Sequence, residues 1–217
     1  MTPLEWAGPL AQGLQTTLLL TGCGAALATV LALLAGLARL SPLRSVRSAA
    51  RVYVEVFRGT SALVQLFWFY YALPLVGVRL DAFTASALVL GLNTGAYGAE
   101  VVRGALMGIS REQWDAAAAL RLSRWQTLRR IILPQAIVDM LPPANNLLIE
   151  LLKNTALVSL VTIADLTFQA QALRAATLES GAIFGVVLLT YFAMATLLTA
   201  GMRRFERHAG RWREGTA

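Results

Sequence analysis

Long apolar runs separated by short clusters of arginine limit what this sequence can fold into. The first run, residues 16–37, is long enough to cross the roughly 30 Å hydrocarbon core of a bilayer as a helix. The arginines that follow it are Arg39, Arg44, Arg47 and Arg51. Only 14% of the residues are charged, whereas a soluble domain has about 25%. The pattern predicts a single all-α membrane domain that occupies residues 1–217.

The apolar runs predict five membrane-spanning helices. Their approximate bounds are residues 16–37, 59–78, 82–102, 142–164 and 181–202. Arginine-rich segments stay in the cytoplasm, which places the first loop, the long loop at 103–134 and the C-terminal tail inside. The N-terminus is then outside. Because the first residues contain no Lys or Arg, we expect the first span to be retained rather than cleaved as a signal peptide.

Charge distribution and residue usage exclude several classes of function. The net charge is +7, but the arginines lie in short clusters between apolar runs, which argues for membrane topology rather than nucleic-acid binding. A lone cysteine, Cys23, excludes a disulfide framework and a cysteine-based metal site. The single histidine, His208, leaves no catalytic or zinc-binding set. We therefore expect no metal site and no catalytic residues.

The third predicted span carries an unusual set of polar residues. Asn93, Tyr97 and Glu100 follow at i, i+4 and i+7 and so share one helical face. Polar side chains in a span normally face protein or a water-filled cavity. Gly95 lies among them, and we expect it to permit close helix contact and to leave room for a ligand. Alternatively, Glu100 only pairs with Arg103 near the inner membrane surface.

Ion pairs and helix breaks are also predicted in other spans. Glu55 with Arg58, and Glu150 with Lys153, have the i,i+3 spacing of ion pairs. Proline should end or kink a helix. The prolines concerned are Pro74 in the second span and Pro134, Pro142 and Pro143 ahead of the fourth. In the last span, Gly181 and Gly185 predict a face for close helix contact.

The stretch 109–134 is too polar for a span and reads as a helix–turn–helix. Ser110 with Gln113, and Ser123 with Gln126, have the spacing of two capping boxes. The first helix is mostly alanine, which lets another surface approach closely. It therefore predicts a helix that fits a groove on a partner protein. An amphipathic helix lying on lipid headgroups is the alternative.

The spacing of Asp115-Ala116-Ala117, Arg121 and Ile131-x-Leu133-Pro134 resembles the EAA loop of ABC importer permeases. The resemblance implies a coupling helix that inserts into a cytoplasmic ATPase subunit. The coupling residues it implies are Asp115, Ala116, Ala117, Ala118, Leu120 and Arg121. The family usually has Glu at the position of Asp115 and Gly at that of Arg121. Since glycine there serves a turn with positive φ, either this turn differs or the Arg121 backbone is strained.

Further motifs resemble the polar amino acid branch of these permeases, the histidine, glutamine, glutamate and arginine type. They are Phe57-Arg58-Gly59-Thr60, Val64-Gln65-Leu66-Phe67, Asn93-Thr94-Gly95-Ala96-Tyr97-Gly98-Ala99-Glu100, Leu133-Pro134-Gln135-Ala136, Leu152-Lys153-Asn154-Thr155 and Phe205-Glu206-Arg207. One departure is Ser61, where the family usually has proline. The resemblance implies a type I importer permease, multi-pass in the cytoplasmic (inner) membrane of a prokaryote, that works by alternating access.

The resemblance also implies partners. These are two ATPase subunits, a second permease subunit that is either identical or homologous, and an extracytoplasmic amino-acid-binding protein. The chain lacks a G-x-x-x-x-G-K-[ST] phosphate loop, so ATP and Mg²⁺ are expected on the partner ATPases and no cofactor on this chain. Within the pathway, Glu100 suits a cationic group of the substrate. Asn93, Tyr97 and backbone amides exposed by Gly95 suit its carboxylate.

Three other readings stay open. The first is a permease for another small polar solute, since EAA loops occur across ABC importers. The second is a channel or a structural membrane protein without ATP coupling, in which Glu100 and Lys153 are merely structural. An intramembrane enzyme is the least favoured, because no HExxH motif and no histidine within a span are present. The identity of the amino acid does not follow from the sequence.

Overall fold

The computed structural model describes residues 3–214 of the chain, and the side chains of residues 6–209. Within this part every regular element is helical. The elements are α1 (Pro3–Ala38), α2 (Arg44–Gly59), α3 (Ala62–Phe67), a π-helical turn η1 (Trp68–Ala72), a 3₁₀ turn η2 (Leu73–Val76), α4 (Ala82–Gly108), α5 (Arg111–Ala119), α6 (Arg124–Thr127), a π-helical turn η3 (Leu128–Ile132), α7 (Leu133–Asn154), a 3₁₀ turn η4 (Thr155–Val161), α8 (Leu166–Thr177) and α9 (Ser180–Glu214). The predicted all-α class is confirmed.

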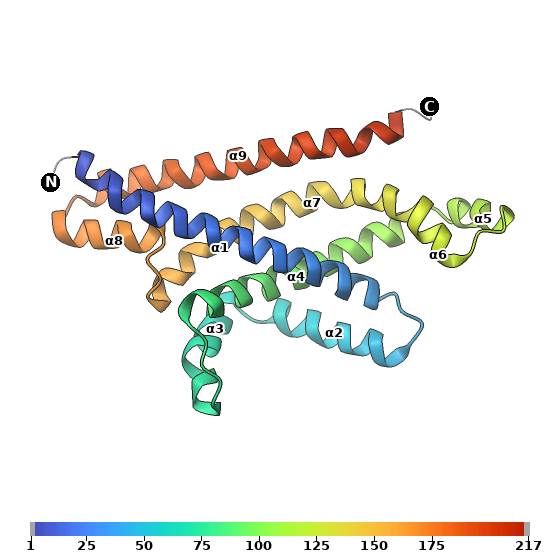
Figure 1. Ribbon diagram of the computed structural model, residues 1–217, viewed down its shortest axis with the longest axis horizontal. Coiled ribbons are helices and arrows are strands. Elements are labelled where there is room, and N and C mark those ends of the chain that lie inside the picture. The colour runs from blue at the N-terminus through green and yellow to red at the C-terminus, as the bar shows by residue number, and fades with distance from the viewer. Residues whose placement is uncertain (1–2, 215–217) are drawn as a thin grey trace.

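Glycines on α4 bring this helix against α1 over much of their length. A Cβ built at Gly91 would lie 2.6 Å from the Leu27 side chain, and one at Gly98 would lie 2.7 Å from the Cβ of Ala32. Real Cβ atoms do not approach so closely, so glycine is required for this packing. Figure 1 shows α1 lying along α4, with α2 on one side and α7 on the other. Glycines of α4 thus allow α1 and α4 to pack closely.

The prolines of α7 lie inside the helix, contrary to prediction. Pro142 and Pro143 are both internal to α7, and Pro134 lies in its first turn. Helical residues of η3 precede Pro134 directly, so this proline does not interrupt the helical turns that lead into α7. The helix therefore begins at Leu133 rather than after the prolines, and it ends at Asn154, where η4 continues the chain. Pro74 does end its helix, since η2 stops at Val76 and Gly77 is left-handed.

The segment 165–180, which lies between the fourth and fifth predicted spans, contains α8. Asp165 is fully buried, and its carboxylate accepts hydrogen bonds from the N–H groups of Phe168 (2.9 Å) and Thr167 (3.2 Å). The hydroxyl of Thr17 on α1 accepts the N–H of Leu166 at 3.2 Å. These contacts cap α8 and fix its first turn against α1. Gly181 and Gly185 on α9, in contrast, meet nothing within 4 Å, so the predicted contact face is open in this chain.

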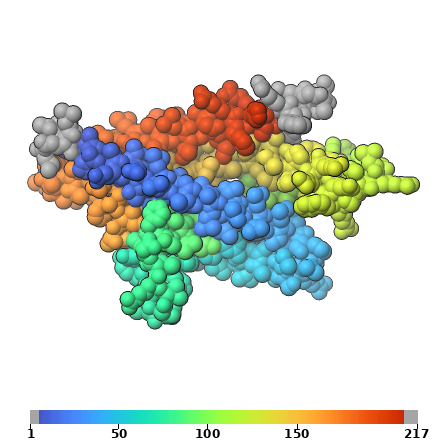
Figure 2. All heavy atoms as spheres, in the orientation of Figure 1, coloured from blue at the N-terminus to red at the C-terminus, as the bar shows by residue number. Residues whose placement is uncertain are grey.

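Two ends of the molecule differ in the elements that they carry. The loop 39–43, α5, α6 and the C-terminal end of α9 lie toward one end, and α8 with the start of α1 lies at the other (Figure 1). In the space-filling view α3 and the turns after it project away from the remaining helices, and the α5–α6 region forms a tip (Figure 2). The arginine-rich segments therefore share one end of the molecule.

Two helices in the described residues are long and apolar enough to cross a membrane, Trp6–Ala38 and Ser180–Ala209. The number rises to four if each of two bent pairs forms one span. These pairs are Arg44–Gly59 with Ala62–Val76, bent by 103°, and Arg124–Val161 with Leu166–Thr177, bent by 52°. The predicted count of five is thus not confirmed. The long helix α4 is outside this set, because Asn93, Tyr97 and the glycines dilute its apolar residues.

Candidate functional site

The break between α2 and α3 is the most irregular point in the helical core. The predicted span 59–78 corresponds to Ala62–Val76, and α2 is the other arm of the bent pair. Thr60, which follows α2, is extended at φ −123° and ψ 152°. The last carbonyls of α2 therefore have no partner in a continuing helix. Irregular backbone of this kind is tolerated at membrane depth where protein covers it or where it lines a water-filled cavity.

Side chains from α4 and α3 satisfy these carbonyls. The amide nitrogens of Asn93 and Gln65 donate to the Phe57 carbonyl at 2.8 and 2.9 Å. Asn93 also donates to the side-chain oxygen of Gln65 at 3.3 Å. Gln65 donates further to both oxygens of Thr60, and the Tyr97 hydroxyl donates to the Arg58 carbonyl at 3.4 Å. The predicted shared face of Asn93 and Tyr97 thus binds the end of α2.

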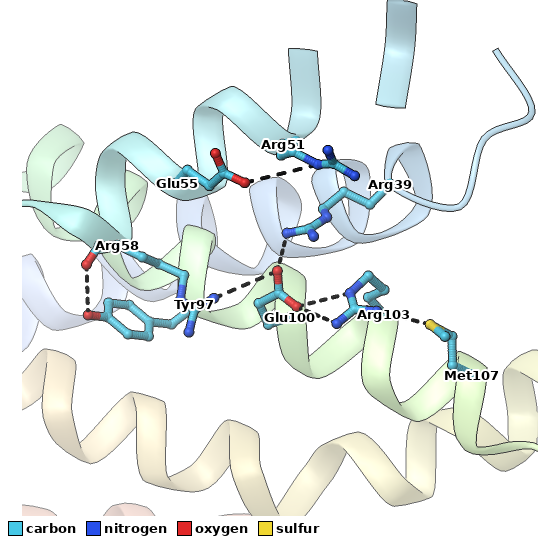
Figure 3. Close-up of polar contacts among 8 residues, drawn as sticks. All are labelled: Arg39, Arg51, Glu55, Arg58, Tyr97, Glu100, Arg103 and Met107. Carbon is cyan, nitrogen blue, oxygen red and sulfur yellow. Dashed lines mark hydrogen bonds and ion pairs between the residues drawn. The ribbon is translucent and has the colours of Figure 1, made fainter. Parts of the chain in front are cut away.

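Glu100 continues this face and lies among three arginines from three segments (Figure 3). One carboxylate oxygen accepts a hydrogen bond from Arg39, just after α1, and lies 3.7 Å from the Arg58 guanidinium. The other accepts two bonds of 2.9 Å from Arg103. The side chains of Glu100 and Arg39 are 21% and 17% exposed. The Arg103 pairing is confirmed, but it is one of three.

Two predicted ion pairs are wrong. Glu55 pairs with Arg51, with 4.0 Å between their nearest charged atoms, because Arg58 turns toward α4 instead of back along α2 (Figure 3). Glu150 and Lys153 are both exposed, and no ion pair joins them in the part of the chain that the structure describes. The i,i+3 spacing made both pairs possible, but the direction of each side chain is set by tertiary contacts.

Gly95 does not leave room for a ligand within this chain. A Cβ at this position would lie 2.9 Å from the Cβ of Leu31 and 3.0 Å from the hydroxyl of Tyr53. Tyr53 in turn donates to the carbonyl of Leu92 at 2.8 Å. The space beside Gly95 is therefore filled by α1 and α2. The predicted close helix contact at Gly95 is confirmed. The predicted room for a ligand beside Gly95 is wrong.

Most of the predicted coupling residues lie on the exposed surface of α5 and the turn after it. Asp115, Ala116 and Ala118 are exposed, and the Leu120 side chain is 71% exposed. Trp125 on α6 adds a second large apolar side chain, 67% exposed. Ala117 is the exception, because it is fully buried. A run of four alanines gives no sequence signal for which of them is buried, so the burial of Ala117 was not predicted.

The turns around α5 follow one of the two predicted capping boxes. Ser123 accepts the N–H of Gln126 at 3.3 Å, and the Gln126 side chain accepts the Ser123 N–H at 2.9 Å. Ser110 makes no side-chain cap, and the oxygen of Gln113 accepts from Gln135 on α7 at 3.4 Å instead. The first capping box is therefore wrong.

Arg121 has a left-handed backbone. Of the two alternatives given for this position, a different turn or a strained arginine, the structure has the strained arginine. Its φ is +54°, in a region that costs a residue with a Cβ about 1–2 kcal/mol. The N–H groups of Arg121 and Leu122 donate to the carbonyls of Ala118 and Ala117 at 2.9 and 3.1 Å. These two bonds close the last turn of α5. The turn is therefore formed with arginine in the place of glycine, and the strain is present.

Fold and site together define an all-helical membrane protein with a broken, arginine-flanked helix at its centre and an exposed helix pair at one end. A family model described as "Binding-protein-dependent transport system inner membrane component" matches residues 28–211. The chain belongs to this family of inner membrane transport components.

Individual relatives agree with this assignment. The probable amino-acid ABC transporter permease protein y4tF of Sinorhizobium fredii is 44% identical, covering 96% of this chain and 90% of its own length. The glutamine transport system permease protein GlnP of Escherichia coli is 38% identical, with 91% of each chain covered. A crystal structure of an amino acid ABC transporter with histidines has a TM-score of 0.88 and 32% identity, covering 94% and 96% of the two chains.

Proposed function

We propose that the protein is the membrane-spanning permease subunit of an ATP-driven importer for polar or charged amino acids. The observation that carries the proposal is the exposed face of α5, with Asp115, Ala116, Ala118 and Leu120 presented at the end of the molecule where the arginine-rich segments gather. Membership of the family and the names of its relatives, which include permeases for glutamine and for L-cystine, support the substrate class.

In this proposal the chain crosses the prokaryotic inner membrane five times, with its N-terminus outside and its C-terminus in the cytoplasm. The helix α4 serves as the third span although its composition is less apolar than that of α1 or α9. Its polar face packs on α2 and its glycine face on α1. Polar side chains that are covered by protein in this way are compatible with a membrane environment.

The coupling step takes place at α5. We assign Asp115, Ala116, Ala118 and Leu120 to direct contact with an ATPase subunit. Ala117 and Arg121 instead shape the turn, because Ala117 is buried and Arg121 closes the last turn of α5. ATP and Mg²⁺ are bound by two separate ATPase subunits, and their closure carries α5 with them. The pathway then alternates between outward-open and inward-open states, a population shift driven from a distant site.

The substrate pathway passes the broken helix. Asn93 and Tyr97 act there by fixing the end of α2, and Glu100 acts by holding the three arginines around it. A second permease subunit, identical or homologous, supplies the other wall, and an extracytoplasmic amino-acid-binding protein delivers the substrate. Gly95 acts in packing, since its free side is filled by α1.

Affinity purification of the tagged protein in mild detergent tests the importer and the coupling face together. An ATPase subunit should co-purify in a stable ratio with the wild type. Ala118→Asp should reduce its recovery at least tenfold, because a charge is placed on the exposed docking face. Ala175→Asp is the matched control, since it places the same charge on an exposed alanine of α8, at the other end of the molecule.

Each outcome has a separate meaning. Equal recovery of the ATPase with Ala118→Asp would show that α5 is not the contact. Absence of any ATPase subunit from the wild-type preparation would contradict the importer. In that case, solute flux through liposomes containing this protein alone would favour a channel. Ala117→Asp is unsuitable for this test, because burying a charge at a fully buried position would damage the fold itself.

A further inference from the structure

Arg58 lies at the end of α2, where the broken helix begins and beside the inner end of the proposed third span. Its carbonyl accepts the hydroxyl of Tyr97, near the middle of α4 (Ala82–Gly108), and its guanidinium lies 5.1 Å from the centre of the Tyr97 ring. Charged side chains at membrane depth face protein or a water-filled cavity. The Arg58 side chain is nevertheless 42% exposed. The Arg58 guanidinium is therefore accessible at the broken helix, beside the substrate pathway proposed above.

Positive charge exceeds negative charge around Arg58. One carboxylate, that of Glu100, stands against the guanidinium groups of Arg39, Arg58 and Arg103 (Figure 3). The nearby Arg51 and Glu55 pair with each other and add no net charge. The cluster of Arg39, Arg58, Glu100 and Arg103 thus carries more cations than its own anion neutralises. Such a cluster is suited to binding a further anion.

Arg58 is the least tightly held of the three arginines. Arg103 makes two bonds of 2.9 Å to Glu100, and Arg39 is hydrogen-bonded to the other oxygen. Arg58 lies 3.7 Å from that same oxygen, beyond hydrogen-bond distance, and is more exposed than either. Both oxygens of Glu100 are therefore occupied without Arg58. The Arg58 guanidinium is free to take another carboxylate while its backbone stays fixed by Tyr97.

We propose that Arg58 receives the α-carboxylate of the amino acid as it passes the broken helix. The inference rests on the proposed importer function and deepens it. A guanidinium binds a carboxylate through two parallel N–H···O bonds, a geometry that lysine does not reproduce. Glu100 is occupied by Arg39 and Arg103, so it does not take the substrate ammonium. The excess positive charge makes the pathway favour amino acids of zero or negative net charge over cationic ones.

The test uses the complete transporter, purified with its ATPase and reconstituted with its binding protein. Uptake of each proteinogenic amino acid and of cystine first identifies the substrate. Binding of that labelled amino acid to the transporter without the binding protein is then competed with the unlabelled amino acid and with its carboxamide, in which the carboxylate charge is lost. The wild type should bind the amino acid about 10- to 100-fold better than the amide, the range for one charge-assisted pair.

Arg58→Gln should abolish this preference, so that amino acid and amide compete equally and weakly. Arg58→Lys keeps the charge next to Glu100, and with it the fold, but it should still lose most of the preference because the paired geometry is gone. Arg51→Gln is the matched control on the same helix, since Arg51 is exposed and its ion pair is with Glu55, outside the cluster around Glu100. It should leave the preference unchanged.

The outcomes distinguish failure of the proposed importer function from failure of the proposed role of Arg58. A wild-type transporter that takes up no amino acid would contradict the proposed function, and the role of Arg58 with it. A wild type that takes up an amino acid, together with Arg58 variants that retain its preference over the amide, would overturn the role of Arg58 alone. Preferential uptake of arginine and lysine over neutral amino acids would also overturn it.

Discussion

The side-chain amide of Asn93 lies 2.8 Å from the backbone carbonyl of Phe57 and joins the middle of α4 to the last turn of α2. Gln65 on α3 donates to the same carbonyl at 2.9 Å. One carbonyl therefore connects three helices at the point where the chain turns by 103°. The polar residues of this region hold an irregular backbone, and that backbone positions Arg58.

Replacing Asn93 should loosen this junction. Asn93→Leu has nearly the same volume, but it removes the donor to Phe57 and leaves the side-chain oxygen of Gln65 without that bond. We expect a loss of about 1–3 kcal/mol in the free energy of unfolding, the cost of an unmade buried hydrogen bond. Denaturant unfolding in detergent measures it, with Thr94→Val on the next residue as control. A stability equal to that of the wild type would show that the junction does not depend on Asn93.

Two glycines of α4 should respond in opposite ways to the same substitution. In Gly98→Ala the new methyl group would lie 2.7 Å from the Cβ of Ala32, so α1 and α4 must separate. We expect a destabilisation of about 1–3 kcal/mol. In Gly104→Ala the methyl group meets nothing within 4 Å, and the helix should gain up to about 1 kcal/mol. The melting temperatures of the two variants in the same detergent should lie on opposite sides of the wild type.

Relief of backbone strain should be measurable at Arg121. With φ at +54°, Arg121→Gly removes a steric cost and should stabilise the tip by up to about 1 kcal/mol. Arg121→Val, with a branched Cβ in the same conformation, should lose a similar amount. Hydrogen exchange of the Leu122 amide, which donates to Ala117, reports on this turn directly. Slower exchange in the valine variant than in the glycine variant would contradict the argument.

The start of α4 should depend on pH through Asp81. Hydrogen bonds from the side chain and the backbone N–H of Thr84 hold the pKa of the Asp81 carboxyl below its ordinary value. The ionised cap thus stabilises the helix above the ordinary pKa, and this contribution is lost as pH falls through the folded pKa. Asp81→Ala should melt lower than the wild type at neutral pH and equally in acid. Asp81→Asn, which keeps a cap, should show little of this pH dependence.

The sequence predicted the helical class, the exposed helix pair and the shared face of Asn93, Tyr97 and Glu100, because each depends on local pattern. The i, i+4, i+7 spacing and the Ser123–Gln126 box are properties of a single helix. The residues that contact this face lie on α2, on α3 and just after α1, so the local pattern of α4 does not predict them. Gln65 was overlooked as a functional residue, although a glutamine within an apolar run was a signal for it.

The failures lie where distant segments compete for one side chain. Arg58 has Glu55 one turn away, but Glu100 on another helix faces it. At Ser110, the Gln113 N–H donates to the Ser110 carbonyl instead of its hydroxyl, and the Gln113 side chain contacts Gln135 on α7 instead of returning to Ser110. Likewise, Pro142 and Pro143 lie within a helix because its packing in the core outweighs the local cost of the prolines. Tertiary contacts decided each of these cases.

The uninterrupted length of α4 has a mechanical consequence. Its 27 residues make a rod of about 40 Å, which begins at Ala82, carries Asn93 and Glu100, and ends two residues before α5. Clamped along α1 by its glycines, this rod resists bending. Beyond the two extended residues that join it to α5, a displacement of the end of α4 would therefore reach the broken helix as the movement of one rigid helix.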